Sequence, residues 1–557
     1  MSVFIGYPSF MAYQMMKGKK DNNEGFPTIP GTIARYSALG LTNEEMSKNP
    51  VWVDKIGNGH DLQMKNFAWK GMSGVGGYEM NFNLWGNNVP NVPDISMSTT
   101  TTSVSVSVGN STSTYNNNLI YIYINNWDIN KNHWLKVTST YEDGDLVFLF
   151  YEDSNTKKIG LPANGYVNIL AYPEFKGNYM YISTTSNKQG SFTIEQLPLY
   201  SGALVFDGVD DCGVCDNFPI LTKEKGYTVV VLRQWDQDFL NTTLTGGLLS
   251  TRNHSTGEGV AFEKIESSNK GYWNLGAGGI IDFAKSPFTW QTSKQYNNVG
   301  ILKGDKNHGK PLCVGCGLSG GQQCGRFAIW ELVFLDHDAT EEELTKIKDY
   351  FVKTYPWLFP DQAWTVVGKT NEDEDRATIA NITGNGNDLV LSNFGFAEGS
   401  GYNEEGEYAG YLVTDGVDDK IVSSVFGMGK DFTIVGDWKF IDNKKSGTGL
   451  VKGSSFYIYN TMIGLDLYIN SGSVKNSLDG IKSINAACSD GRAYDRNWNE
   501  ILANTGNVVG SGGMLEVSSS GGRFDRIAFK NLAIYPRILS KDDCIKAYNH
   551  LQTLKAK

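Results

Sequence analysis

The sequence predicts an all-β protein made of two β-sandwich domains, the first carrying an inserted small β-domain and each closed by a short helix. Three observations support this prediction. The 557 residues include 63 glycines but only 15 prolines, a balance that suits many short strands joined by tight turns. Three blocks of sequence recur in the same order. A short amphipathic pattern follows the last block in each copy, as expected for a duplicated domain.

The first recurring block combines a Thr-Asn-Glu segment, a Gly-Asn-Gly turn and an Asn-Phe pair. Its two copies are residues 40–45, 57–62 and 66–67, and residues 368–373, 384–389 and 393–394. Asn-Gly readily supplies the positive φ of a tight hairpin turn, and that need explains the two Gly-Asn-Gly segments without a ligand.

The second block is an LVxDGVDD segment, and the third is a Gly-Arg-Phe segment that begins a long apolar strand. The copies are Leu204–Asp211 and Leu412–Asp419 for the second block, and Gly325–Leu332 and Gly522–Phe529 for the third. Three collinear matches indicate an internal duplication.

A short helix is expected after each third block. Thr340 with Glu343, and Ser540 with Asp543, have the spacing of a residue that caps a helix N-terminus and its reciprocal partner. Apolar residues at spacings of three and four follow each start and predict one buried stripe.

The first copy contains an insertion. The GNG and DGVDD blocks begin at residues 57 and 207 in the first copy but at 384 and 415 in the second. About 100 extra residues therefore lie near positions 95–200, on a loop where insertions are well tolerated. Val104, Val106 and Val108 alternate with serines there, the period of a half-buried strand.

These boundaries divide the chain into four parts. We expect an N-terminal arm over residues 1–35, a first sandwich over 36–94 and 201–358, the inserted β-domain over 95–200 and a second sandwich over 361–557. Pro356 and Pro360 flank the junction between the sandwiches.

The repeated blocks resemble laminin-G-like (concanavalin A-like) jelly-roll domains. The resemblance rests on the DGVDD turn, the late strand Leu532–Tyr535 and the Arg-Ile-Leu-Ser segment that leads into a short helix. It covers most of residues 200–358 and 400–557. The longer combination of GNGxDL, Asn-Phe and Ile194–Tyr200 running into DGVDD is similar to structural proteins of crAss-like and related phages of Bacteroidetes.

The phage resemblance implies a virion structural protein of the tail, fibre or capsid surface, assembled in the host cytoplasm. The implied partners are other virion proteins, further copies of the chain as a homo-oligomer, and a host-surface glycan. Two alternatives stay open: a carbohydrate-binding module or adhesin that recognises host capsule polysaccharide, and a polysaccharide depolymerase.

Charge and hydropathy exclude other classes. A formal net charge of −11 repels phosphate, so we expect no direct contact with nucleic acid. No apolar run approaches the roughly 18 residues of a membrane span. Met1–Met16 is not expected to be a signal peptide, because its lysines (Lys17, Lys19 and Lys20) follow the apolar part.

The acidic turns are candidate calcium sites, because several carboxylates converge within a few residues and Ca²⁺ prefers oxygen ligands. The competing interpretation is structural, since Asp and Gly are what a tight turn needs. The residues concerned are Asp207, Asp210, Asp211, Asp415, Asp418 and Asp419.

Two Cys-x-x-Cys pairs in the first sandwich predict a structural zinc site, because two such pairs complete a tetrahedral set of thiolates. They are Cys212 with Cys215 and Cys313 with Cys316, and Cys324 is a possible substitute ligand. The alternative is that these cysteines act as small apolar residues. Disulfides are less expected, because no secretion signal is evident.

No arrangement of residues indicates catalysis, so the sequence predicts that the chain is not an enzyme. The six histidines are scattered without an HExxH or triad-like setting. Aromatic side chains are candidates for stacking on sugar rings, although most aromatic residues in β-sandwiches belong to the core. The candidates are Trp235, Trp273, Trp290 and Trp438.

Overall fold

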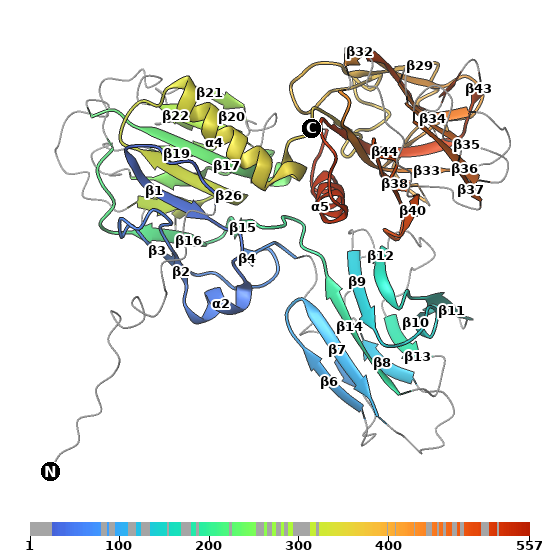
Figure 1. Cartoon of the computed structure of the whole chain (residues 1–557), viewed down its shortest axis with the longest axis horizontal. Helices are drawn as coiled ribbons and strands as arrows, with labels where there is room; N and C mark the ends of the chain where they lie inside the picture. Colours follow the sequence, from blue (N-terminus) through green and yellow to red (C-terminus); the bar gives the residue numbers. More distant parts are fainter. Residues whose placement is uncertain are drawn as a thin grey trace.

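A computed structural model gives the fold of most of the chain (Figure 1). It describes residues 25–78, 86–88, 95–109, 119–123, 134–152, 155–168, 180–184, 189–221, 225–251, 261–264, 270–273, 280–282, 288–292, 312–318, 322–397, 399–406, 408–427, 429–441, 448–453, 456–460, 464–469, 476–479, 484–502, 512–517, 519–520 and 523–556. Within these ranges, no helix has the length and apolar character needed to cross a membrane.

The first sandwich, here sandwich A, packs two mostly antiparallel sheets face to face. One sheet has the order β22 (Phe288–Thr292), β17 (Thr228–Trp235), β26 (Arg326–Leu335), β15 (Leu204–Asp207) and β4 (Gly74–Val75), and β1 (Thr32–Ser37) also pairs with β26. The other sheet has the order β2 (Val51–Trp52), β3 (Leu62–Lys65), β16 (Cys212–Cys215), β23 (Leu312–Val314), β18 (Gly246–Ser250), β19 (Ala261–Lys264), β20 (Lys270–Trp273) and β21 (Ile280–Asp282). The hairpin of β24 (Cys316–Leu318) and β25 (Gln322–Cys324) joins this second sheet through β18.

The second sandwich, here sandwich B, repeats this plan. One sheet has the order β30 (Gly401–Asn403), β31 (Tyr411–Val413), β44 (Ile527–Tyr535), β33 (Thr433–Phe440), β38 (Ile484–Cys488), β39 (Ala493–Asp495) and β40 (Glu500–Leu502), with β27 (Gln362–Thr365) on β44. The other has the order β28 (Thr378–Ile379), β29 (Leu389–Ser392), β32 (Lys420–Gly427), β41 (Gly512–Val517), β34 (Thr448–Gly453), β35 (Phe456–Asn460), β36 (Gly464–Ile469) and β37 (Asn476–Asp479). A two-residue-strand hairpin, β42 (Ser519–Ser520) with β43 (Arg523–Phe524), follows β41.

The duplication extends to irregularities of the strands. The pairing of β17 with β26 shifts between Leu232 and Arg233, and the pairing of β33 with β44 shifts at the equivalent step, between Asp437 and Trp438. A bulge alters the side-chain alternation and twist of a strand. Its repetition therefore shows that both copies share one backbone plan in detail.

The third block aligns differently from the sequence-based match. Ile329 pairs with Leu204, and Phe529 pairs with Leu412. Arg326 is therefore equivalent to Arg526, and not to Arg523 as the Gly-Arg-Phe match predicted. Strand pairing decides the equivalence, and the second Gly-Arg-Phe motif belongs to the separate β42–β43 hairpin.

Each sandwich is closed by the helix that the sequence predicted. Helix α4 (Glu341–Thr354) begins with a complete capping box between Thr340 and Glu343. Helix α5 (Lys541–Gln552) begins at Ser540, whose hydroxyl accepts a hydrogen bond from the Asp543 backbone N–H. The other short helices among the described residues are α2 (Asn43–Lys48), α3 (Gln237–Leu240) and the 3₁₀ helix η4 (Pro356–Leu358).

The inserted domain consists of two five-stranded antiparallel sheets. One has the order β11 (Asn155–Gly160), β10 (Leu146–Glu152), β13 (Met180–Thr184), β8 (Leu119–Tyr123) and β5 (Gly86–Asn88). The other has the order β12 (Asn164–Asn168), β9 (Trp134–Ser139), β14 (Gly190–Gln196), β7 (Ser103–Val108) and β6 (Ile95–Thr99). On β7, Val104 and Val106 are buried and Val108 is half-buried, so the alternation with serine marks the core face.

Two boundaries differ from the sequence-based ones. Strand β1 begins at Thr32 and pairs with β26, so residues 32–35 belong to sandwich A and not to an arm. Strand β5 begins at Gly86 and pairs with β8 of the insert, so the insert starts before residue 95. The rest of the predicted arm, residues 1–24, lies outside the described residues.

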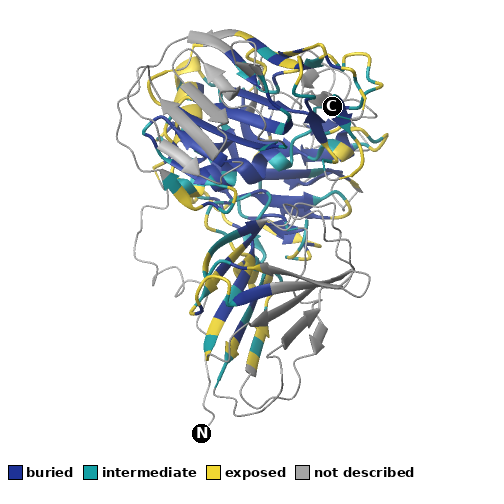
Figure 2. Ribbon diagram, turned by 90° about the vertical axis from the view of Figure 1, so that its right-hand side faces the viewer, coloured by how far each residue is buried: buried dark blue, intermediate teal, exposed yellow. Residues whose placement is uncertain are grey.

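The three domains meet around α5, which lies between the sandwiches and above the near end of the insert (Figure 1). One continuous hydrophobic cluster contains Trp134 of the insert, Trp330 and Tyr350 of sandwich A, and Trp498 and Tyr548 of sandwich B. Figure 2 shows the buried residues continuing from the sandwiches into the top of the insert. We call this region the three-domain junction.

Candidate functional site

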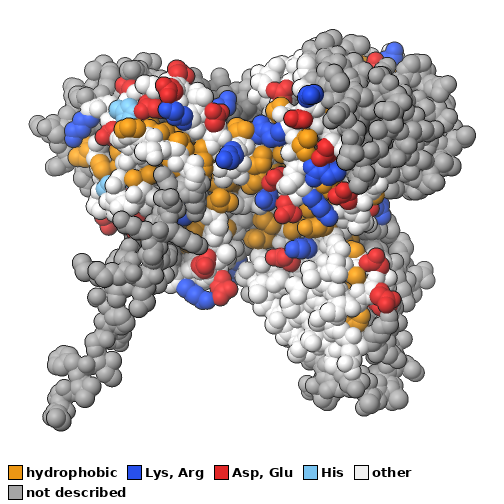
Figure 3. All heavy atoms as spheres, in the orientation of Figure 1, with side chains coloured by type: hydrophobic (Ala, Val, Ile, Leu, Met, Phe, Trp, Pro, Cys, Tyr) orange, Lys and Arg blue, Asp and Glu red, His pale blue; other side chains and the backbone are white. Residues whose placement is uncertain are grey.

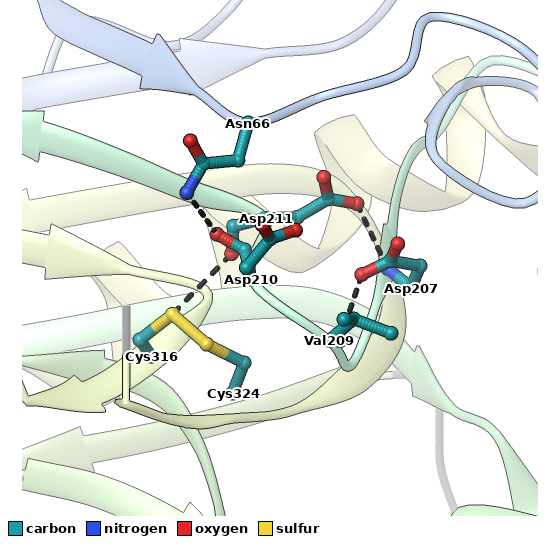
Figure 4. Close-up of a disulfide and its surroundings, with 7 residues drawn as sticks. All are labelled: Asn66, Asp207, Val209, Asp210, Asp211, Cys316 and Cys324. Carbon is teal, nitrogen blue, oxygen red and sulfur yellow. Dashed lines mark hydrogen bonds between the residues drawn. A yellow bond between two sulfur atoms is a disulfide. The ribbon is translucent and has the colours of Figure 1, made fainter. Parts of the chain in front are cut away.

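The first acidic turn is held by hydrogen bonds to its most buried carboxylate (Figure 4). Asp211 is fully buried, and its side chain accepts hydrogen bonds from the Asp207 backbone N–H at 2.9 Å and from the Ser73 hydroxyl at 2.9 Å. Asn66, on the neighbouring loop, donates its side-chain N–H to the Asp210 carbonyl at 3.0 Å. Gly208 at φ +78° lets the chain reverse within these few residues.

The second acidic turn repeats these contacts. The Asp419 carboxylate accepts from the Asp415 backbone N–H at 2.8 Å and from the Ser400 hydroxyl at 3.1 Å. Asn393 donates to the Asp418 carbonyl at 3.0 Å. The first recurring block therefore stabilises the second, because its asparagine donates a hydrogen bond to the backbone of the acidic turn in both copies.

Electrostatics distinguish the members of each turn. Burial, reinforced by neighbouring carboxylates and opposed by hydrogen bonds to the charged form, raises the pKa of Asp211 to about 7 and that of Asp419 to about 6. In each turn one oxygen from each of the three carboxylates lies within 4.8 Å of the others. The hydrogen bonds explain the buried aspartate of each turn without a cation, and calcium binding stays a prediction.

The cysteines are not grouped as the two Cys-x-x-Cys pairs predict. Residues three apart on a strand lie on opposite faces, so Cys212 and Cys215 of β16 point to different sides of the sheet. Cys215 belongs to the core between the two sheets of sandwich A. Cys212 instead packs with Cys313, Cys316 and Cys324. The predicted set that included Cys215 is therefore wrong, and Cys324 takes its place.

We call Cys212, Cys313, Cys316 and Cys324 the four-cysteine cluster. All four are at most 6% exposed. Cys316 and Cys324 are opposite each other on β24 and β25 and form a disulfide, so the expectation against disulfides is wrong for this pair. Cys212 and Cys313 are free thiols, and the hydrogen bond from Cys313 lowers the pKa of Cys212 to about 7.

Gly315 makes the turn that brings the cluster together. It has φ +101°, and a Cβ there would lie 2.5 Å from the Asp211 carbonyl oxygen and 2.6 Å from the Phe206 ring. No other residue type fits this approach without displacing the backbone. The same turn places the Cys316 sulfur 3.4 Å from the Asp211 carbonyl oxygen (Figure 4), so the cluster adjoins the first acidic turn.

The candidate sugar-stacking tryptophans do not form an exposed platform among the described side chains. Trp235 and Trp438 are 1% and 3% exposed and belong to the cores of sandwiches A and B. Stacking on a sugar by these two residues is therefore contradicted, because neither ring face reaches solvent. Trp273 and Trp290 belong to β20 and β22, and their side chains lie outside the described residues.

The three-domain junction contains buried contacts that the sequence did not indicate. Trp134 of β9 contacts Trp498 and Tyr548, with ring centroids 6.1 and 5.4 Å apart. His550 of α5 makes a 2.6 Å hydrogen bond from Nε2 to the side-chain oxygen of Gln234 in sandwich A. A buried histidine in the last turn of α5 is the only local signal of this contact, because the partner is 316 residues away.

The surface seen in Figure 3 carries Lys and Arg side chains interspersed with Asp and Glu. Such intermixing gives no extended field of one sign on this face.

No protein-family model and no curated protein matches the chain. Solved structures that resemble it include Trypanosoma rangeli sialidase in complex with the inhibitor DANA, at 8% identity over 82% of this chain and 83% of that chain, with a TM-score of 0.26. Another is the botulinum neurotoxin serotype D binding domain, at 12% identity over 62% of this chain and 89% of that chain, with a TM-score of 0.23. Because sialidases are enzymes, this comparison contradicts the prediction that the chain is not an enzyme, and that prediction is withdrawn. TM-scores this low carry no argument for a particular activity or ligand.

Proposed function

We propose that this chain is a structural protein of a bacteriophage particle, in which three β-domains form one rigid bracket that holds neighbouring virion proteins. The observation that carries the proposal is the continuous apolar core of the three-domain junction. The assignment to a phage particle rests on the resemblance of the repeated blocks to phage structural proteins.

The junction supports rigidity because its contacts are of the kind found inside a domain. Interfaces between domains of one chain usually resemble transient, partly polar interfaces that let the domains move. Here Trp134, Trp498 and Tyr548, at most 4% exposed, come from two domains and touch one another. Burial of one such side chain contributes on the order of 1.5–3 kcal/mol. Separating the insert from sandwich B would expose all three side chains and would therefore cost several kcal/mol.

Polar contacts fix the angle between the sandwiches. Gln234 of β17 accepts a hydrogen bond from His550 and donates one to the Thr553 hydroxyl at 2.9 Å. Lys555 near the C-terminus pairs with Asp238 of α3. Hydrogen bonds depend on direction, so these contacts define one orientation where apolar packing alone allows several. A protein that spaces its neighbours within a particle needs such a defined orientation.

Glycan recognition stays the alternative function, but no described side chain favours it. The two candidate tryptophans with described side chains are buried. Sandwich folds host many unrelated functions, so the fold itself does not decide between the two.

The direct test is to locate the chain in purified particles of the phage that encodes it. Mass spectrometry of the particles is expected to recover the chain in fixed proportion to the other structural proteins. Antibodies raised against the insert should label one defined position in electron micrographs. Absence of the chain from particles, while it accumulates in the infected cell, would overturn the proposal. Tight binding of the purified chain to a glycan array would establish the alternative.

A further inference from the structure

We propose that the four-cysteine cluster is a structural zinc site that fastens the β24–β25 hairpin onto the second sheet of sandwich A. The ligands are the sulfurs of Cys212, Cys313, Cys316 and Cys324. This inference is independent of the proposed function, because it concerns how one sandwich is held together whatever its partner is.

The first argument is the convergence of the sulfurs. The Sγ atoms of Cys212, Cys313 and Cys316, from three different strands, all lie within 4.8 Å of one another. The Cys324 sulfur is bonded to that of Cys316. A tetrahedral zinc site with Zn–S bonds of about 2.3 Å places its sulfurs about 3.8 Å apart. A disulfide needs only two sulfurs near each other, whereas here three strands place three sulfurs within 4.8 Å of one another.

The second argument comes from the duplicated copy. Strand pairing gives the equivalents in sandwich B: Cys212 and Cys313 correspond to residues of β32 and β41, and Cys316 and Cys324 to residues of the β42–β43 hairpin. These four positions are occupied by Lys420, Glu516, Ser519 and Phe524.

Two of the equivalent positions, Lys420 and Phe524, also approach one another in sandwich B. The Lys420 ammonium lies 5.7 Å from the centroid of the Phe524 ring, which is the contact equivalent to Cys212 with Cys324. Sandwich B therefore brings this pair together without any cysteine, and none of the four equivalent positions holds one. Since the fold does not need cysteine at any of them, its presence at all four in sandwich A indicates that the thiols act as one set.

The four-cysteine cluster is separate from the core and has charged groups of both signs beside it. The four cysteines form a buried cluster of their own with Val214, separate from the core between the sheets. Lys65 of β3 is the strand partner of Cys212, so a cation adjoins the site. A zinc ion with four thiolates has a net charge of −2, which this cation offsets in part, while Asp210 of the adjoining acidic turn adds negative charge nearby.

Zinc and the Cys316–Cys324 disulfide exclude each other. Two equivalents of a small-molecule thiol reduce the disulfide, giving two cysteine thiols and one small-molecule disulfide. Zn²⁺ then replaces the four thiol protons, which pass to solvent. No other bond changes, and the Cys316 and Cys324 sulfurs move from bonding distance to the spacing of about 3.8 Å that two ligands of one zinc ion have.

The test uses the full chain, produced in zinc-supplemented medium and purified with a phosphine reductant. Elemental analysis is expected to find about one zinc per chain. Cys212→Ser and Cys324→Ser should each lose most of this zinc. Cys215→Ala is the matched control, because Cys215 lies on the same strand as Cys212 but faces the opposite side, and it should keep the metal.

A measurement on the unmodified chain covers the case in which a serine variant fails to fold. Thiol alkylation followed by peptide mass spectrometry should show all four cysteines protected in the zinc-loaded chain and exposed together after a chelator is added. Cobalt substituted for zinc should give thiolate-to-metal charge-transfer absorption. The proposal is overturned if the folded, reduced chain holds neither metal, if Cys215→Ala loses zinc while Cys324→Ser keeps it, or if Cys212 and Cys313 form a second disulfide in protein isolated from cells.

Discussion

Lowering the pH is expected to loosen the contact between the two sandwiches, because the junction buries a neutral histidine. His550 is 6% exposed, and burial lowers the pKa of its imidazole from 6.5 to about 4. Its Nε2 bonds to the Gln234 side-chain oxygen, and its Nδ1 has no hydrogen-bond partner among the described residues. A proton on Nδ1 would therefore place an uncompensated charge within the junction.

The size of the effect follows from the two pKa values. A base whose pKa falls on folding stabilises the folded state less as the pH drops, because the unfolded chain takes up the proton first. The loss of folding stability caused by His550 is absent above pH 6.5, grows as the pH falls from 6.5 to 4, and reaches its full size below pH 4. At 1.36 kcal/mol per pH unit the whole loss is about 3 kcal/mol, and about 2 kcal/mol of it occurs between pH 7.5 and 5.

The assay compares the wild-type chain with His550→Gln, which keeps a side-chain N–H for Gln234 but does not titrate. Urea unfolding at pH 7.5 and pH 5 gives the apparent free energy of unfolding of each protein. The wild-type chain should lose about 2 kcal/mol more than the variant between these pH values. The titrations of Asp211 and Asp419 are common to both proteins and cancel in the comparison. Equal losses in the two proteins would refute the reasoning.

Three further predictions concern single contacts. Asp211→Ala leaves the Asp207 N–H and the Ser73 hydroxyl without their acceptor and should lower the free energy of unfolding by about 1–3 kcal/mol. The control Asp210→Ala, at an exposed position of the same turn, should change the free energy of unfolding by less than about 0.5 kcal/mol. Equal effects of the two substitutions in denaturant titrations would contradict the role of Asp211. Trp134→Ala should lower stability by about 3–5 kcal/mol and increase the radius of gyration in X-ray scattering, whereas an unchanged radius would argue against the rigid bracket. Glu331→Leu should lower stability by about 3–5 kcal/mol by leaving the fully buried Arg35 without its ion pair, and adding Arg35→Met should recover much of this loss in thermal unfolding; no recovery would disprove the explanation.

The duplication and the helix starts were predictable because each can be recognised from the order and spacing of residues without knowing which segments pack together. Repeated blocks keep their order whatever the fold, and a capping box involves residues only three apart. The alternation of valines on β7 likewise identified its buried face, because a strand sends every second side chain to one side. The acidic turns were found for the same reason, and the structure adds that Asn66 and Asn393 close them.

The sequence by itself therefore determined the fold class, the two copies, the insertion and the positions of the closing helices, since each depends on patterns within a few residues or on repetition. Only the tertiary structure decided which cysteines meet, that Trp235 and Trp438 are core residues, and that Trp134, Tyr548 and His550 form a junction of three domains. The physical reason is that strand alternation divides side chains between two faces but does not say which layer will cover either face. Partners such as Cys212 with Cys324, or Gln234 with His550, come together only when segments distant in the chain pack against one another.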